Sequence, residues 1–302
     1  MDSNTLKLAP GALRQEMARQ VLASAIDRNY VVPYAAMLTS LREHNPHVGV
    51  AAYVLHYDLM EDDRRFLEAV SDRTGIDVTL IRVPAYPFRS FTTRRRNNIA
   101  GKDKMAAISY AKAFVDRYLP TDVGRLVCID ADIVVNGDMS EIWQMDVTSP
   151  VMAAANIPRM HSHQFNSGFM LLDLAEWRRW GISDIAERFL TRYSDSLHSH
   201  DQHVLNLIFK DRWQRLDLKW NYIEDHFRFR KKSETAYSEA EVIAARDAPV
   251  VVHYAVGSDK PWHPYSQHPR ADLYRVCHAK LQPLMAGLEL NDPQDQRWPS
   301  QS

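Results

Sequence analysis

Cysteine is scarce in this sequence. The 302 residues include two cysteines, and Cys128 and Cys277 lie far apart in apolar surroundings. Two cysteines are too few for a disulfide framework or for a cysteine zinc site. We therefore expect a protein of the reducing cytoplasm.

An excess of charge of either sign is also missing. Lys and Arg number 37 against 38 Asp and Glu, so the formal net charge is -1. Proteins held on nucleic acid by bulk electrostatics are clearly basic, so no nucleic-acid partner is expected. An anionic ligand would have to be bound locally.

Long hydrophobic runs are absent as well. Nowhere does the chain offer about 18 uncharged apolar residues in a row, so no transmembrane segment is expected. Residues 1–10 show no basic region leading into an apolar one, which argues against a signal peptide. Without a dense cationic amphipathic helix, membrane contact is limited to weak peripheral attachment at the inner membrane face.

Linkers rich in Gly, Ser or Pro and internal repeats are not found either. With 45% hydrophobic and 25% charged residues, the chain can bury a substantial core. We expect a single domain over residues 1–290 and a disordered tail over 291–302, which has one Trp and no other core former. Within the domain we expect a nucleotide-binding half, a donor-sugar and acceptor half, and a C-terminal helix, at about 20–155, 156–265 and 266–290.

What the sequence does contain is an alternation of apolar strands and amphipathic helices. This pattern predicts an α/β fold with a mainly parallel central sheet and helices on both faces. The strands are expected at residues 21–25, 48–56, 78–83, 125–129, 151–155, 167–173 and 249–252. The helices are expected at 33–44, 61–74, 104–118, 174–193 with an interruption at Gly181, and 201–209, while the polar residues 230–248 are expected to form a flap.

Two carboxylates stand where the strand at residues 125–129 ends. In extended chain the side chains of Asp130 and Asp132 share one face about 6–7 Å apart, with the small Ala131 between them. Such a pair can bind one hard divalent cation and its phosphates. An Asp-x-Asp in a loop can equally be a solvated turn, so the pair alone does not decide.

Other segments form an ordered set with this pair. Taken together, they resemble the family eight retaining glycosyltransferases over about residues 21–265, and bacterial lipooligosaccharide galactosyltransferases and glucosyltransferases look nearest. The resemblance implies the GT-A fold for nucleotide diphospho-sugars. The segments that carry it are Asp130–Asp132, Phe165–Leu174 with Trp177, Asp201–Asn206, Trp220–Tyr222 and His253–Trp262.

The resemblance also implies a metal site and a diphosphate site. His253 would join Asp130 and Asp132 as a third ligand, and a nitrogen among oxygens favours Mn²⁺ over Mg²⁺, which stays possible. Gly257 would let the backbone approach the phosphates, and Lys260 would place an ammonium against them. The alternatives are a core histidine and a simple turn.

The donor itself would meet two further groups of residues. Asp27, Asn29 and Tyr30 resemble the segment that holds uracil and ribose, although Asp and Asn are also common turn residues. Asn166, Asp201 and Gln202 would meet the donor sugar, with Gln202 facing the anomeric carbon; capping of the following helix is the alternative for Asp201. These catalytic candidates are Asn166, Asp201 and Gln202.

Gln202 stands where a retaining enzyme with a covalent intermediate would carry a nucleophilic carboxylate. An amide favours front-face displacement, in which the acceptor hydroxyl attacks from the side of the departing diphosphate. The expected oxocarbenium-like species would be stabilised by the phosphate and by Gln202.

One departure from the family pattern falls at Lys112. Relatives usually carry Arg at this position, and Lys keeps the charge but not the planar fork. The basic run Arg94–Arg96 could be a solvated loop or a lid over the donor, and residues 157–164, with Arg159, His161 and His163, could contact the acceptor.

The sequence therefore predicts a metal-dependent hexosyltransferase. The expected donor is UDP-galactose or UDP-glucose, and the expected acceptor is a hydroxyl of a glycan or glycolipid. A UDP-sugar hydrolase and a self-glycosylating primer protein remain the alternatives.

Overall fold

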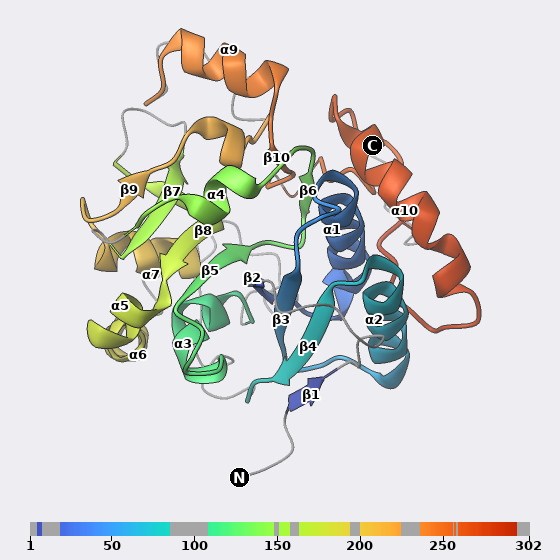
Figure 1. The fold of residues 1–302 in the computed structure, drawn as a ribbon, viewed down its shortest axis with the longest axis horizontal. Helices are drawn as coiled ribbons and strands as arrows, with labels where there is room; N and C mark the ends of the chain where they lie inside the picture. The colour runs from blue at the N-terminus through green and yellow to red at the C-terminus, as the bar shows by residue number, and fades with distance from the viewer. Residues whose placement is uncertain are drawn as a thin grey trace.

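The computed structural model describes most of the chain, and the fold is built around one large sheet (Figure 1). The described residues are 5–7, 19–84, 108–147, 151–157, 163–193, 200–224, 236–255, 257 and 259–294.

The large sheet combines a parallel centre with an antiparallel strand beside it. Its order is β1-β4-β3-β2-β5-β8-β7-β9. Strands β4, β3, β2 and β5 run parallel, whereas β8 is antiparallel to both β5 and β7. The bounds are β1 Thr5–Lys7, β2 Gln20–Ala25, β3 Val50–His56, β4 Asp77–Arg82, β5 Arg125–Ile129, β7 Met152–Asn156, β8 Phe165–Asp173 and β9 Gln214–Arg215.

A second, two-stranded sheet continues the chain directly after β5. Strand β6, Ile133–Val135, pairs antiparallel with β10, Val251–His253. In this register His253 lies opposite Ile133, the residue that follows Asp132. The small sheet thus brings a residue from near the end of the chain to the carboxyl end of β5.

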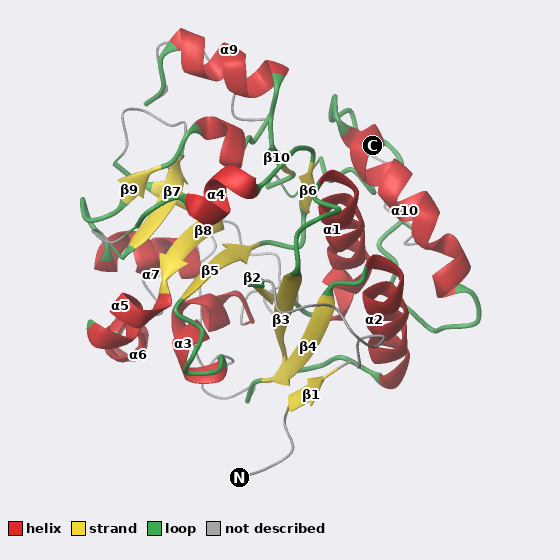
Figure 2. Cartoon of the chain, in the orientation of Figure 1, coloured by secondary structure: helices red, strands yellow, loops and turns green. Residues whose placement is uncertain are grey.

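Helices cover both faces of the large sheet, as the sequence predicted (Figure 2). Helices α1, α2 and α10 share one hydrophobic core with the sheet, and η4, α3, α5, α6 and α7 share the other. The bounds are η1 Arg28–Tyr30, α1 Val31–His44, α2 Glu61–Thr74, η4 Ile108–Phe114, α3 Val115–Tyr118, α4 Ser140–Gln144, α5 Leu174–Arg179, α6 Ile182–Tyr193, α7 His200–Ile208, η6 Leu218–Trp220, α9 Glu239–Asp247 and α10 Ala271–Met285.

Alternation along β5 decides what its last residues face. Val127 and Ile129 belong to the core under α1, whereas Leu126 and Cys128 belong to the core under η4 and α7. Side chains alternate with a period of two in a strand. Asp130 therefore continues the side of Cys128 and points toward η4 and α7.

Several predicted boundaries are confirmed by local chemistry. Helix α2 ends at Thr74 because Gly75 takes a left-handed conformation, with φ 62°. Gly181 has the same φ of 62° and separates α5 from α6, as expected. Strand β5 has the predicted bounds.

The helix predicted at 104–118 was wrong in type. Residues 104–107 lie outside the described part, 108–114 form a 3-10 helix, and only 115–118 are α-helical. The segment contacts β2, α6 and α7, and this packing overrides the local helical pattern. The winding directs Lys112 into the protein, where it is buried.

The flap and the tail also differ from expectation. Residues 239–247 form a helix whose first turn is capped by Ser238 and Glu241, while 230–235 lie outside the described part. The C-terminal helix is shorter than 266–290. Asp292, placed in the tail, is buried and accepts a hydrogen bond from Nε2 of His278 at 2.8 Å, so the packed chain extends past residue 290.

Candidate active site at the carboxyl end of β5

Asp130 and Asp132 leave the sheet in a backbone path fixed from two sides. The N–H of Asp130 donates to the carbonyl of Gly168 on β8 at 2.8 Å, and the carbonyl of Asp132 accepts from the N–H of Tyr254 at 2.9 Å. The backbone of Asp130 is thus bonded to the large sheet, and the backbone of Asp132 is bonded to the residue that follows β10 of the small sheet. The solvated-turn interpretation does not fit, because Asp132 exposes only 12% of its side chain.

His253 completes a cluster of three ligand groups with these carboxylates. Its Nε2 lies 3.3 Å from Oδ1 of Asp132 and 3.9 Å from Oδ2 of Asp130. One ligand atom from each residue lies within 4.8 Å of the others. Two carboxylate oxygens and an imidazole nitrogen form a donor set that suits a divalent transition metal such as Mn²⁺. The residues present therefore fit the metal that the sequence implied.

Two buried lysines balance the charge of the pair. Nζ of Lys112 lies 2.8 Å from Asp130 and 2.7 Å from Asp201, and it donates to the carbonyl of Ser167 at 3.3 Å. The contacts with Asp130 and Ser167 are hydrogen bonds, whereas the contact with Asp201 is an ion pair that lacks hydrogen-bond geometry. Lys260 makes a close ion pair with Asp132 and also donates to the carbonyl of Tyr254 at 2.5 Å.

The two carboxylates respond differently to this environment. Burial raises the pKa of Asp130, and Lys112 only partly offsets that effect. Burial also opposes ionisation of Asp132, but Lys260 and His253 outweigh it and hold the pKa of Asp132 well below its usual range. Burial disfavours the charged form of Lys112, yet Asp130 and Asp201 raise its pKa. The site holds fixed, paired charges in a water-poor setting.

The three residues expected at the donor sugar come together beside this cluster. The amide of Asn166, on β8, donates to Oε1 of Gln202, on α7, at 2.9 Å. Asp201 is buried against Lys112, and α7 begins one residue earlier, at His200, so its side chain serves the ion pair. Through Lys112 the carboxylates of Asp201 and Asp130 share one counter-ion.

Helix α7 is held in register by Asn206, four residues after Gln202. Its side-chain oxygen accepts from the N–H of Phe165, and its amide donates to the carbonyl of Phe165, both at 2.9 Å. Residues four apart lie on the same face of a helix. Asn206 therefore fixes the face of α7 that presents Gln202 to β8. The sequence motif contained Asn206 but gave it no role.

Asn221 and Gly168 were also missed as individual site residues. Asn221 is buried; its oxygen lies 2.8 Å from Nδ1 of His253, and its amide donates to the oxygen of Asn166 at 2.8 Å. Gly168 leaves the space into which the His253 ring fits, because a Cβ there would come 2.7 Å from Nδ1. Both residues lie within the sequence motifs. Their individual roles became visible only from their contacts in the folded protein.

The segment expected to hold uridine lies near the same cluster. Asp27 caps the turn by accepting from the N–H of Asn29 at 2.9 Å, and burial raises the pKa of Asp27 to about 6. Burial raises the pKa of the Tyr30 hydroxyl, and the nearby charges of Asp132, Asp27 and Asp130 raise it further. Residues 27–30 and the carboxylate pair thus share one edge of the sheet.

The C-terminal segment holds this turn from outside. The side-chain amide of Asn291 donates to the side-chain oxygen of Asn29, and Arg28 donates to the carbonyl of Glu289 at 3.2 Å. Trp262 is buried with its ring edge-on to Tyr30, with centroids 6.0 Å apart. The rings and the chain end together support the turn.

Gly257 and Lys260 differ in how far the structure explains them. Lys260 contacts Asp132 and the carbonyl of Tyr254, which together account for two of its three N–H groups. At Gly257 a Cβ would meet no heavy atom of the described residues within 4 Å, and the φ angle lies outside the left-handed region. Nothing among the described residues therefore requires glycine at position 257.

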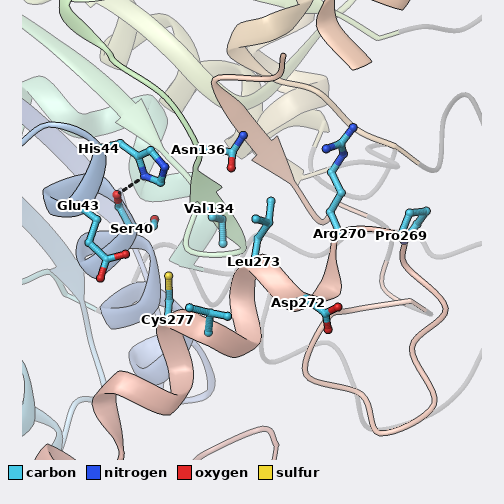
Figure 3. Close-up of a pocket in the computed structure, with 11 residues that line it drawn as sticks. Ser40, Glu43, His44, Val134, Asn136, Pro269, Arg270, Asp272, Leu273 and Cys277 are labelled. Atoms are coloured by element: carbon cyan, nitrogen blue, oxygen red, sulfur yellow. Dashed lines mark hydrogen bonds between the residues drawn. The ribbon is translucent and has the colours of Figure 1, made fainter. Parts of the chain in front are cut away.

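A cavity of about 360 Å³ lies elsewhere, between α1, β6 and α10 (Figure 3). None of the candidate site residues lines this cavity, so the candidate site and the cavity are separate places in the fold. Its lining consists of Ser40, Glu43, His44, Val134, Asn136, Pro269, Arg270, Asp272, Leu273, Val276 and Cys277.

Some predicted contacts cannot be placed. The basic run 94–96 and the possible acceptor residues Arg159 and His161 lie outside the described residues, whereas His163 is described and exposed. These roles stay predictions.

The sequence model of glycosyl transferase family 8 matches residues 21–265, which is most of the chain. The chain belongs to glycosyl transferase family 8. Among the relatives of this family 8 protein is general stress protein A of Bacillus subtilis, 26% identical over 267 residues, covering 84% of this chain and 91% of the relative. The lipopolysaccharide 1,2-glucosyltransferase of Escherichia coli K12 is 22% identical over 270 residues, covering 85% of this chain and 76% of the relative.

Solved structures share the fold of this family 8 chain. The galactosyltransferase LgtC, in complex with donor and acceptor sugar analogues, matches with a TM-score of 0.72 at 21% identity, covering 86% of this chain and 96% of the other. GlyE of Streptococcus pneumoniae matches with a TM-score of 0.61 at 17% identity, covering 88% and 62%. The expected GT-A glycosyltransferase fold is confirmed.

Within the described residues of this family 8 protein, no helix combines the length and apolar character needed to cross a bilayer.

Proposed function

We propose that this chain is a metal-dependent, retaining hexosyltransferase. It transfers galactose or glucose from a UDP-sugar to a hydroxyl of a glycan or glycolipid by front-face displacement. Membership of family 8 supports the transfer of a sugar, and relatives named as lipopolysaccharide glucosyltransferases support this type of acceptor.

One observation carries the proposal. Nζ of Lys112 lies 2.8 Å from Asp130, a candidate metal ligand, and 2.7 Å from Asp201, a residue proposed to bind the donor sugar. A nucleotide sugar has its diphosphate and its hexose joined through the anomeric carbon, so an enzyme must hold the two parts side by side. The shared lysine links residues suited to each part.

Different side chains bind different parts of the proposed donor. Asp27, Asn29 and Tyr30 hold the uridine, and Gly257 and Lys260 meet the diphosphate. A divalent cation held by Asp130, Asp132 and His253 would supply positive charge against the leaving group.

Three residues serve the sugar end of the donor: Asp201, Asn166 and Gln202. Asp201 accepts hydrogen bonds from sugar hydroxyls and forms an ion pair with Lys112. Asn166 holds the amide of Gln202 in place. Because residue 202 is an amide, we expect no covalent sugar adduct on it. A cytoplasmic location and weak peripheral membrane contact remain predictions from the sequence.

A panel of nucleotide sugars tests the proposal. UDP release is measured with Mn²⁺, Mg²⁺ or a chelator, with and without galactose- or glucose-terminated glycans and glycolipids. We expect UDP-galactose or UDP-glucose to react, and we expect chelation to abolish turnover. Release without acceptor at the same rate would indicate a hydrolase, and a mass increase of one hexose on the protein would indicate a self-glycosylating primer. Activity that survives chelation would overturn the metal assignment.

A further inference from the structure

A continuous chain of hydrogen bonds runs from His253, in the candidate metal-ligand cluster, to Gln202, one of the residues proposed to meet the donor sugar. Nδ1 of His253 lies 2.8 Å from the oxygen of Asn221, whose amide donates to the oxygen of Asn166 at 2.8 Å. The amide of Asn166 in turn donates to Oε1 of Gln202 at 2.9 Å. Three elements, β10, β8 and α7, are thereby joined through side chains alone.

The direction of this chain is set by the backbone. Side-chain amides can be turned over, but the N–H of Gly168 can only donate, and it lies 2.9 Å from the side-chain oxygen of Asn166. The amide nitrogen of Asn166 is therefore turned the other way, toward Gln202. Asn221 must then meet that same Asn166 oxygen with its NH₂ group, which leaves the oxygen of Asn221 facing His253.

Each end of the chain follows from this constraint. An oxygen opposite Nδ1 of His253 requires a proton on Nδ1, so Nε2 is the ring nitrogen that faces Asp130 and Asp132. At the other end, Oε1 of Gln202 accepts from Asn166, and it also lies 3.4 Å from the N–H of Ser167. Both lone pairs of this oxygen face protein donors, so the NH₂ group is the part of the amide left for a ligand.

We propose that Asn221 and Asn166 are positioning residues through which the N–H of Gly168 fixes both His253 and Gln202. His253 is held with the Nδ1 proton directed at Asn221, so Nε2 is presented to the carboxylate pair. Gln202 is held so that it donates its NH₂ to an oxygen of the bound donor. This inference rests on the proposed function for the identity of the ligands.

The consequence for the chemistry differs from the sequence-based hypothesis. That hypothesis let Gln202 stabilise an oxocarbenium-like sugar, which requires an exposed carbonyl oxygen. An amide that presents N–H groups instead favours negative oxygen atoms, such as those of the departing diphosphate, or the sugar hydroxyls.

The Nδ1 proton can be observed directly. The protein is labelled with ¹⁵N-histidine, and the His253 ring signals are assigned by comparison with His253→Gln. At pH 8 without metal, we expect a proton on Nδ1 of His253. An Nδ1 without a proton would overturn the inference, whatever the enzyme transfers.

Two substitutions separate the two ends of the chain. Asn221→Leu removes the partner of Nδ1, and loss of such outer partners lowers metal affinity about 10- to 100-fold. Mn²⁺ titration followed by electron paramagnetic resonance measures this affinity.

Asn166→Asp still accepts hydrogen bonds from Gly168 and Asn221 but has no proton to donate to Gln202. We expect Asn166→Asp to keep Mn²⁺ affinity within about threefold and to lower kcat about 100-fold, as for loss of one oriented donor.

A matched control is Asn136→Asp on the loop after β6, which loses a hydrogen bond to the carbonyl of Pro249. We expect it to retain Mn²⁺ affinity and turnover. Equal losses of Mn²⁺ affinity in Asn166→Asp and Asn221→Leu would refute the directed chain. If wild-type protein shows the expected Nδ1 proton and binds Mn²⁺ but transfers no sugar from any donor, the proposed function fails while the positioning of His253 stands.

Discussion

Gly168 and His253 occupy overlapping space: a methyl group on Gly168 would run into the imidazole ring, coming 2.7 Å from Nδ1. The two residues come from β8 and β10, which belong to different sheets. The ring can sit above the carboxylate pair only because β8 has no side chain at this position.

Gly168→Ala should therefore disturb the ligand cluster directly. The new methyl group must displace His253 or β8, and overpacking of this kind lowers the free energy of unfolding by about 1–3 kcal/mol. We also expect weaker Mn²⁺ binding. Thermal unfolding and Mn²⁺ titration check both effects. Gly124→Ala is the control, since a Cβ there would meet no atom of the described residues within 4 Å.

Gly257→Ala should behave in the opposite way. Among the described residues no atom lies within 4 Å of the new methyl group, so the free energy of unfolding should change by less than about 0.5 kcal/mol. If the backbone at residue 257 approaches the diphosphate, UDP affinity with Mn²⁺ should fall about tenfold, or about 1.4 kcal/mol. Isothermal titration calorimetry measures this, and unchanged affinity would remove residue 257 from the diphosphate site.

Lys112→Met tests the shared counter-ion. The substitution leaves Asp130 and Asp201 without their buried partner, and breaking a buried ion pair on one side lowers the free energy of unfolding by about 3–5 kcal/mol. Urea unfolding is the measurement. Lys219→Met, which breaks the more exposed pair with Glu141, should lower it by no more than about 1 kcal/mol. Equal losses would contradict a special role for Lys112.

His56 should give the protein an acid-sensitive stability. Burial, together with Arg64 and Arg82, lowers the pKa of His56 from 6.5 to about 4. The unfolded chain takes up this proton below about pH 6.5, whereas the native protein does so only near pH 4. Stability is therefore complete above pH 6.5 and declines as the pH falls toward 4, by roughly 1–2 kcal/mol at pH 5.

Replacement of His56 by Gln removes this contribution. Urea unfolding at pH 7.5 and pH 5 should show a smaller drop in the variant than in the wild type. An identical drop in both proteins would assign the acid sensitivity to other groups.

The ligand cluster could be predicted because strand ends carry it. Asp130 and Asp132 follow an apolar run, and parallel strands deliver their ends to one edge. The position of His253 came from the family resemblance, and the antiparallel pairing of β6 with β10 explains it.

The roles of Asn221 and Asn291 could not be predicted in the same way. Asn221 acts through side chains of three separate elements, which no local pattern records. Asn291 belongs to a polar segment, and its contact with Asn29 accompanies the burial of Asp292 against His278. Composition indicates whether a segment is apolar enough to pack, but the residue that Asn291 contacts depends on the completed fold.

The contact between Asn29 and Asn291 also sets an order of assembly. It joins residues 262 positions apart, and loops of such length are slow to close. During translation Asp130, Asp132 and His253 are all present once His253 has been made, whereas the support of the turn at residues 27–30 awaits residues 289–292. A nascent chain halted before residue 289 would carry the whole candidate cation site, while the turn at residues 27–30 would still lack its C-terminal contacts.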